Sequence, residues 1–183
     1  MLYKLWSIKL KTLLLFRHAA TNQFVDNIED HEKELNEEGK RESLQLADWI
    51  RKNQIEVDKV FSSSAERATS TAKILFKSNL DFIIESALYL CDFLVILKII
   101  RGQTNNISSL AIVGHEPSLS ETLNFLVGNS RPDLVSFKKK SYPTAGLAII
   151  NFNVFSWDKI IEKSGVLDAF VTSEYLDYYN EKN

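Results

Sequence analysis

The stretch "LLLFRHAATNQ", residues 13–23, decides the fold, because four apolar residues are followed at once by an arginine, a histidine and a polar loop. A short apolar run of this kind is typical of a strand buried on both faces of a sheet. This first strand is expected at residues 12–16, and similar runs occur at 59–63, 81–84, 110–114 and 146–152. Segments of helical period lie between and beside them, at residues 36–53, 64–77, 87–101 and 117–127. The alternation predicts an α/β fold, a three-layer α/β/α sandwich with a mostly parallel central sheet.

Length and composition bound the class of protein. The 183 residues, 45% hydrophobic and 25% charged, predict one soluble domain over residues 1–183 with a core at about 12–170. The net charge of -2 gives no general attraction for nucleic acid or a membrane, so we expect neither as a partner. Cys91 is the single cysteine, which excludes an internal disulfide and favours a reducing compartment. The N-terminus lacks the pattern of a signal peptide, and we therefore expect a cytoplasmic protein.

Several helix boundaries have a chemical signal. Ser63 and Glu66 fit a capping box at the start of the second helix. Pro117 suits the first turn of the fourth helix, and Gly128 suits the position just past its end. The apolar stretch at residues 87–100 is too short to cross a membrane and is expected to be a buried helix. The expected core faces of the second and fourth helices comprise Ala68, Ala72, Leu75, Leu119, Leu123 and Leu126.

Cationic and imidazole side chains follow three of the predicted strands. Arg17 and His18 follow the first strand, Arg67 lies in the helix after the second, and His115 follows the fourth. Because the carboxyl ends of parallel strands meet at one edge, we expect these four side chains to share a pocket. They would repel one another in an empty pocket, whereas a phosphoryl group would resolve the conflict. One imidazole could then attack phosphorus while the other groups hold its oxygens.

Each of these residues is a weak signal alone. A lone histidine after a strand is more often structural than catalytic, and an isolated Arg67 would usually pair at the surface with Glu66 or Asp58. The argument depends on the occurrence of all four at one predicted edge. His31 lies in an acidic segment and is expected to be solvated.

At these residues the sequence resembles the histidine phosphatase superfamily, also called phosphoglycerate mutase-like, and within it the SixA-type phosphohistidine phosphatases. The resemblance is carried by "LFRHAAT", "SSSAERATSTAKIL" and "IVGHEPSL", with "DHEKELNEEGKRES" and "YPTAGLAIINFNVFSW" matching the SixA branch. It covers roughly residues 12–170 and implies a phosphoglycerate mutase-like fold.

The resemblance implies a role for each matching residue. His18 would be the nucleophile that becomes phosphohistidine, and Arg17, Arg67 and His115 would complete the catalytic pocket. Thr21 and Asn22 are expected to bind substrate; Thr21 matches the mutase-like pattern, whereas Ala19 in place of the usual glycine favours the SixA branch. Lys33 stands where an arginine is usual and lacks its planar fork. No metal and no cofactor are implied.

The region after the third strand carries, in many superfamily members, a glutamate that protonates an alcohol leaving group. The nearby carboxylates here are Glu85, the better candidate, and Asp92, and neither clearly matches. Imidazole leaves more readily than an alkoxide, so a site without a strong acid favours cleavage of a P–N bond.

The expected function is therefore a metal-independent phosphatase for phosphohistidine on a protein, for instance a phosphotransfer domain. The alternatives are a phosphatase for a small phosphoester, with Glu85 as the acid, and a phosphate-binding module without turnover; a mutase is less favoured. Residues 137–140, "FKKK", are expected to be a solvated loop, or else to attract an acidic phosphoprotein. Cys91 is expected to be a buried core thiol, and packing or fraying of the tail at residues 174–183 is left open.

Overall fold

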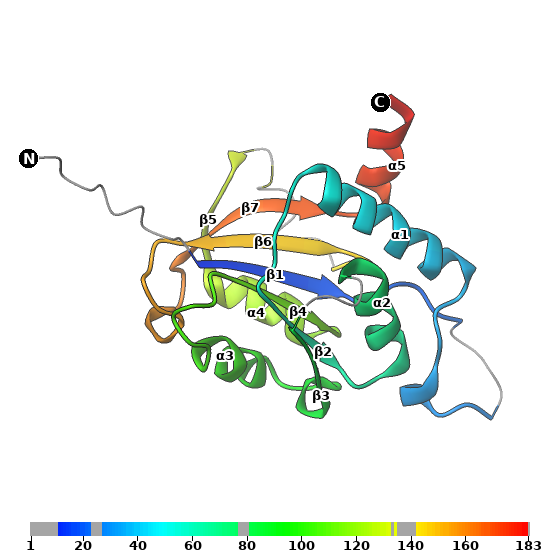
Figure 1. Ribbon diagram of the computed structural model, residues 1–183, viewed down its shortest axis with the longest axis horizontal. Coiled ribbons are helices and arrows are strands. Elements are labelled where there is room, and N and C mark those ends of the chain that lie inside the picture. The colour runs from blue at the N-terminus through cyan, green and yellow to red at the C-terminus, as the bar shows by residue number, and fades with distance from the viewer. Residues whose placement is uncertain (1–10, 23–26, 77–80, 133, 135–141, 183) are drawn as a thin grey trace, which may run out of the picture.

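A central sheet organises the computed structural model, which describes residues 11–22, 27–76, 81–132, 134 and 142–182. Its strands run in the order β3-β2-β4-β1-β6-β7-β5 (Figure 1). The bounds are β1 Lys11–Arg17, β2 Lys59–Ser63, β3 Asp81–Glu85, β4 Ser109–Gly114, β5 Val127–Ser130, β6 Leu147–Phe152 and β7 Gly165–Val171. Only β6 runs antiparallel to its neighbours, β1 and β7, while the other paired strands are parallel. The predicted α/β fold with a mostly parallel sheet is confirmed.

The register of the parallel strands aligns their carboxyl ends in one row. Arg17, the last residue of β1, pairs with Gly114, the last residue of β4. One position earlier in β4, Val113 pairs with Ser62 of β2. Whatever follows these three strands therefore emerges side by side at one edge of the sheet.

Helices cover both faces of the sheet, which gives the three layers. The bounds are α1 Glu37–Lys52, α2 Glu66–Phe76, α3 Phe93–Arg101, α4 Ser118–Leu126 and α5 Ser173–Lys182, with short 3-10 helices η1 Asp30–Glu32, η3 Ser86–Leu88 and η5 Trp157–Lys159. Helices α3 and α4 pack on one face with Leu13 and Leu15 of β1. Helices α1, α2 and α5 pack on the other with Leu14 and Phe16 (Figure 1). Alternate residues of β1 thus enter two cores, and burying each large apolar side chain contributes about 1.5–3 kcal/mol.

The expected core faces of α2 and α4 are confirmed, since all six of their predicted residues are buried. Helix α1 begins where Asn36 accepts a hydrogen bond from Gly39 N at 2.8 Å. The tail forms α5, and its Leu176 is buried in the core beneath α1 and α2. Residues 137–140 lie outside the described residues, as does the position at which the second helix was expected to end, residue 77.

Three local expectations are wrong. The predicted helix at 87–101 is split, because Asp92 caps α3 by accepting from Leu94 N at 2.8 Å. The capping box does not form, since α2 begins at Glu66 and the Glu66 carboxylate accepts from Ser70 at 2.7 Å. Gly128 lies in β5 instead of ending α4, and an added Cβ there would sit 2.1 Å from Lys163 O. Its absent side chain permits a close approach of two chain segments.

Strands β5 and β7 were not predicted.

In the described ranges, no helix combines the length and the apolar character needed to cross a membrane.

Candidate active site

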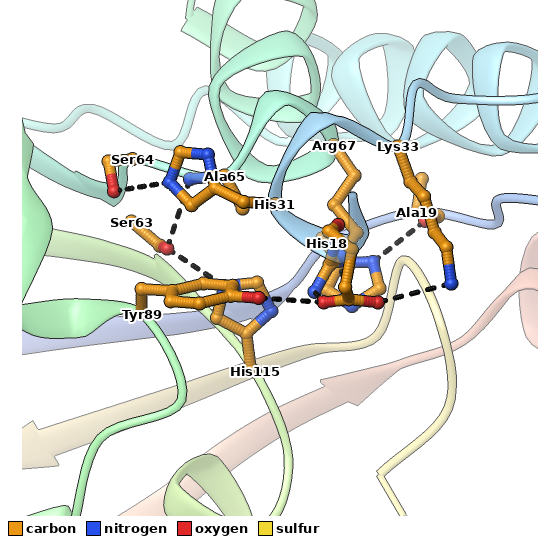
Figure 2. Close-up of polar contacts among 11 residues, drawn as sticks. His18, Ala19, His31, Lys33, Ser63, Ser64, Ala65, Arg67, Tyr89 and His115 are labelled. Atoms are coloured by element: carbon orange, nitrogen blue, oxygen red, sulfur yellow. Dashed lines mark hydrogen bonds and ion pairs between the residues drawn. The ribbon is translucent and has the colours of Figure 1, made fainter. Parts of the chain in front are cut away.

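Three buried side chains meet at the carboxyl edge of the sheet, as the sequence predicted. His18, Arg67 and His115 are only 9%, 5% and 2% exposed. The His18 and His115 rings lie 5.0 Å apart between centroids, and Arg67 Nε donates to His18 Nε2 at 3.3 Å (Figure 2). Side chains separated by about 100 positions in sequence therefore form one cluster.

The hydrogen bonds of His18 fix its tautomer. Its Nδ1 lies 2.9 Å from the carbonyl oxygen of Ala19, which can only accept, so Nδ1 carries the proton. The lone pair is then on Nε2, the atom that receives the Arg67 N–H. A neutral imidazole with its lone pair on Nε2 can act as a nucleophile once the Arg67 N–H turns from Nε2 to an oxygen of the anion.

The loop after β1 is held by buried polar groups. Ala19 N donates to Thr71 Oγ1 at 3.0 Å, and Ala20 N donates to the carboxylate of Glu42 at 3.0 Å. Glu42 is 4% exposed and projects from α1. Helix α1 also presses Gly39 against the loop, because a Cβ there would lie 2.1 Å from Ala20 O. The position of His18 is thus set from α1 and α2 as well as from its own strand.

His115 has one nitrogen in use and one without a partner. Its Nε2 lies 2.8 Å from Ser63 Oγ, at the end of β2. Its Nδ1 is buried and has no hydrogen-bond partner among the described residues. A buried polar atom without a partner costs stability, and a phosphoryl oxygen would satisfy it.

Arg17, the fourth predicted residue, is half-buried and contacts the chain at Tyr142. Its Nη1 donates to Tyr142 O at 2.6 Å, and its Nε is buried without a partner among the described residues. Burial lowers the pKa of its guanidinium, with nearby Glu116 acting in the opposite direction. Arg17 also contributes to lowering the pKa of His18 and of His115, which places its charge within reach of both rings.

Burial keeps both histidines neutral at neutral pH. Desolvation lowers the pKa of His18 from 6.5 to about 4, with Arg67 and Arg17 acting in the same direction. Desolvation, followed by the charges of His18 and Arg67, lowers the pKa of His115 to about 3. The expectation that four cations repel one another in the empty pocket is therefore wrong, because the two imidazoles carry no charge at neutral pH.

Asp30 and Tyr89 complete the site and were not predicted. The Asp30 carboxylate accepts from Arg67 Nη2 at 2.9 Å and from the Tyr89 hydroxyl at 2.8 Å. The Tyr89 ring packs edge-on against His115, with 5.6 Å between centroids. Tyr89 follows η3, in the region where the superfamily acid was sought. The partner of Arg67 is therefore Asp30, and neither of the partners suggested for an isolated Arg67 was correct.

His31 was expected to be solvated, and this is wrong. Its Nε2 lies 2.8 Å from Ser64 Oγ, and its ring lies 4.8 Å from the ring of Tyr89 (Figure 2). Lys33 forms an ion pair with Asp30 at 3.2 Å. Both residues belong to the acidic segment that contains Asp30. Its composition is typical of a solvated segment, so the sequence did not predict its contact with the site.

The contacts of Thr21, Asn22 and Glu85 are with residues other than His18, Arg67 and His115. Thr21 pairs through its backbone with Leu35, and exposed Asn22 accepts from Asn36 at 3.4 Å. Their binding of substrate stays a prediction. The Glu85 carboxylate accepts from the backbone of residue 87 at 3.0 Å and so caps η3.

Cys91 is half-buried, not fully buried, and desolvation raises the pKa of its thiol. Within the described part of the chain, His, Cys, Asp and Glu do not gather in groups of three that could hold a metal ion. The expectation of a metal-independent reaction stays a prediction.

The fold and the site together define a class of protein. A doubly covered α/β sheet presents two arginines, two neutral histidines and an unpaired imidazole nitrogen at the carboxyl ends of its parallel strands. Such a set of donors suits a tetrahedral oxyanion, with one ring nitrogen placed as a nucleophile.

Comparisons with known proteins agree with this class. The sequence model of the Histidine phosphatase superfamily (branch 1) matches residues 13–94. An uncharacterized protein of Mycobacterium leprae is 30% identical over 160 residues, which cover 84% of this chain and 97% of that protein. The chain belongs to the histidine phosphatase superfamily.

Solved structures share the fold. A protein from Agrobacterium tumefaciens, provisionally assigned as the phosphohistidine phosphatase SixA, superposes with a TM-score of 0.74 at 24% identity, covering 88% of this chain and 98% of that one. The protein histidine phosphatase SixA complexed with tungstate gives a TM-score of 0.69 at 17% identity, covering 88% and 96%. The predicted phosphoglycerate mutase-like, SixA-type fold is thus confirmed.

Proposed function

We propose that this protein is a phosphatase that removes the phosphoryl group from phosphohistidine on another protein, through a covalent intermediate on His18. The observation that carries the proposal is the state of His18, a buried neutral imidazole whose Nδ1 proton is held by Ala19 O and whose Nε2 faces Arg67. Membership of the superfamily indicates a phosphatase, while the protein substrate is the finer part of the proposal.

The first step transfers the phosphoryl group to the enzyme. The Nε2 lone pair of His18 attacks phosphorus, and the bond from phosphorus to the substrate nitrogen breaks with its electron pair on that nitrogen. Arg67, Arg17 and the free nitrogen of His115 surround the phosphoryl oxygens and stabilise the charge that develops on them. In the second step water attacks phosphorus, the bond to Nε2 breaks, and its electron pair returns to His18 as phosphate forms.

The surroundings of the leaving group favour a nitrogen over an alkoxide. The carboxylate of Glu85 caps a turn, and the group from this region that reaches the site is the Tyr89 hydroxyl, which donates to Asp30. The hydrogen bond from Tyr89 to Asp30 holds the pKa of the Asp30 carboxyl well below its usual range, so Asp30 is ionised at neutral pH and is no proton donor. Of the described carboxylates near this region, neither Glu85 nor Asp30 is placed and protonated to serve an alkoxide, whereas an imidazole leaves without a proton donor.

Rapid quench after mixing with a peptide carrying labelled phosphohistidine tests the proposal. Label should appear on His18, survive alkali, be lost in acid, and be absent from His18→Ala. His31→Ala is the matched control, because it removes another histidine near the site and should still become labelled.

Comparison of substrates separates the remaining possibilities. The value of kcat/KM should be higher for the phosphohistidine peptide than for an aryl or a sugar phosphate. A preference for the sugar phosphate would identify a small-molecule phosphatase instead. Binding of tungstate without any labelled enzyme would identify a phosphate-binding module, and either result would refute the proposal.

A further inference from the structure

Asp30 places a carboxylate on the solvent side of the buried cluster of His18, Arg67 and His115. Its side chain is 51% exposed, whereas that of its partner Arg67 is 6% exposed, so Asp30 lies between the buried pocket and solvent. Its carboxylate also receives the Tyr89 hydroxyl and the ammonium of Lys33. The site thus has a carboxylate, held by three partners, on its solvent-facing side.

Arg67 can bind Asp30 and a phosphoryl group together. A guanidinium has five N–H groups. Nε–H is directed at His18, while Nη1 and Nη2 each donate to Asp30, to its backbone oxygen and to its carboxylate. One further N–H on each of Nη1 and Nη2 remains for phosphoryl oxygens, so Asp30 need not leave when substrate binds.

The direction of attack brings the leaving group toward Asp30. In an in-line displacement the nucleophile and the leaving group lie on opposite sides of phosphorus. The nucleophile His18 is buried at the inner side, so the leaving group lies toward the solvent-facing side that Asp30 and Tyr89 form.

We propose that Asp30 selects the leaving group: its carboxylate accepts the N–H of the distal nitrogen of a phosphohistidine ring and repels substrates that carry a carboxylate beside the phosphoryl group. This inference rests on the proposed function. A phosphohistidine protonated at its distal nitrogen carries positive charge on the ring. When the P–N bond breaks, the electron pair stays on the departing nitrogen and the ring leaves as neutral imidazole, so no proton has to be delivered.

The ring of His18, the proposed nucleophile, already has its distal N–H held by an acceptor. Ala19 O holds the distal N–H of His18, so phosphorylated His18 is also protonated at its distal nitrogen and leaves as neutral imidazole when water attacks. Asp30 would accept the distal N–H of the substrate ring, just as Ala19 O accepts the distal N–H of His18. The Tyr89 ring contacts the rings of His31 and His115, and together they form an aromatic surface beside Asp30.

Asp30→Asn tests the inference, because the amide keeps the shape and can still accept from Arg67 but carries no charge. Three substrates are compared: a phosphohistidine peptide, p-nitrophenyl phosphate as a reference without a neighbouring charge, and 3-phosphoglycerate. Relative to the reference, kcat/KM for phosphohistidine should fall about tenfold and kcat/KM for 3-phosphoglycerate should rise severalfold. Glu32→Gln, an exposed neighbour in η1 with the same change of charge, should leave both ratios unchanged.

An equal change for all three substrates would overturn the inference. An equal loss would mean that Asp30 only orients Arg67, and an equal gain that it only competes with phosphate for Arg67. Failure of the proposed function is a separate result, since wild-type enzyme would then not favour phosphohistidine, while the ratio for 3-phosphoglycerate still reports on Asp30.

Discussion

Acid should destabilise the protein far more than its composition suggests, because two buried histidines are neutral in the folded state. The pKa of His18 is lowered to about 4 and that of His115 to about 3, whereas both titrate near 6.5 in the unfolded chain. Below pH 6.5 the unfolded state therefore binds protons that the folded state does not, and the free energy of unfolding falls as the pH falls.

The magnitude follows from the number of protons. Each extra proton bound by the unfolded state gives a slope of about 1.4 kcal/mol per pH unit, so the two histidines together give about 2.7. Between pH 6.5 and 4 the loss is on the order of 3 kcal/mol for each histidine, which is large against a typical total of about 5–15 kcal/mol. Asp30 adds to the loss only at the acid end, since an unfolded aspartate takes up its proton near pH 4.

Urea unfolding at a series of pH values between 4.5 and 7 measures this slope. His18→Asn and His115→Asn each remove one titrating group, so each should lower the slope by about 1.4 kcal/mol per pH unit. Saturating tungstate should flatten the slope further, because a bound oxyanion stabilises protonated histidine in the folded state. A flat stability profile in the wild-type protein, or a slope that neither substitution changes, would refute the assignment of two neutral histidines.

Two further substitutions test the packing that positions the site. Gly39→Ala should cost about 1–3 kcal/mol of stability and lower kcat/KM, because its Cβ would displace the Ala20 carbonyl; a urea melt and steady-state kinetics check this, and wild-type values for both would contradict it. Tyr142→Phe should cost about 1–3 kcal/mol in the same melt, since the buried hydroxyl donates to Leu15 O and accepts from Ala148 N, and an unchanged melt would show that these groups find other partners.

The sequence predicts those parts of the fold that have a periodic signal. The strands at 12–16 and 110–114 are apolar on both faces because helices cover both sides, and such runs are visible in one dimension. Strand β7 alternates buried residues with exposed Val166 and Asp168, and β5 is four residues with little apolar character. Their strand character depends on the pairing of β5 with β7 and of β7 with β6, which no local pattern encodes.

The residues of the candidate site also fall into two groups, those that the sequence predicts and those that it does not. Arg17 ends β1, and His18 and His115 directly follow β1 and β4, so the register of the parallel strands brings them together. This placement can be predicted from the sequence. Asp30 and Tyr89 reach the pocket from connecting segments, and their contact with Arg67 spans separations of 37 and 22 positions that no helix or strand periodicity relates. Such residues become visible only when the segments between the elements are placed.

The charge balance of the site bears on how a protein of net charge -2 would bind the proposed phosphoryl group locally. Arg67 and Lys33 face the Asp30 carboxylate, Arg17 lies within the fields of Glu116 and Glu42, and the two imidazoles are neutral. The site therefore does not carry the excess positive charge that its residue types suggest. A phosphoryl dianion would add negative charge to the site. A proton taken up by one of the imidazoles would compensate part of that charge, since a neighbouring anion raises the pKa of a histidine. In the proposed reaction His18 keeps its Nε2 lone pair to attack, and its Nδ1 already holds a proton against Ala19 O. We therefore expect the proton that accompanies the dianion on His115, whose Nδ1, without a partner among the described residues, would then donate to a phosphoryl oxygen.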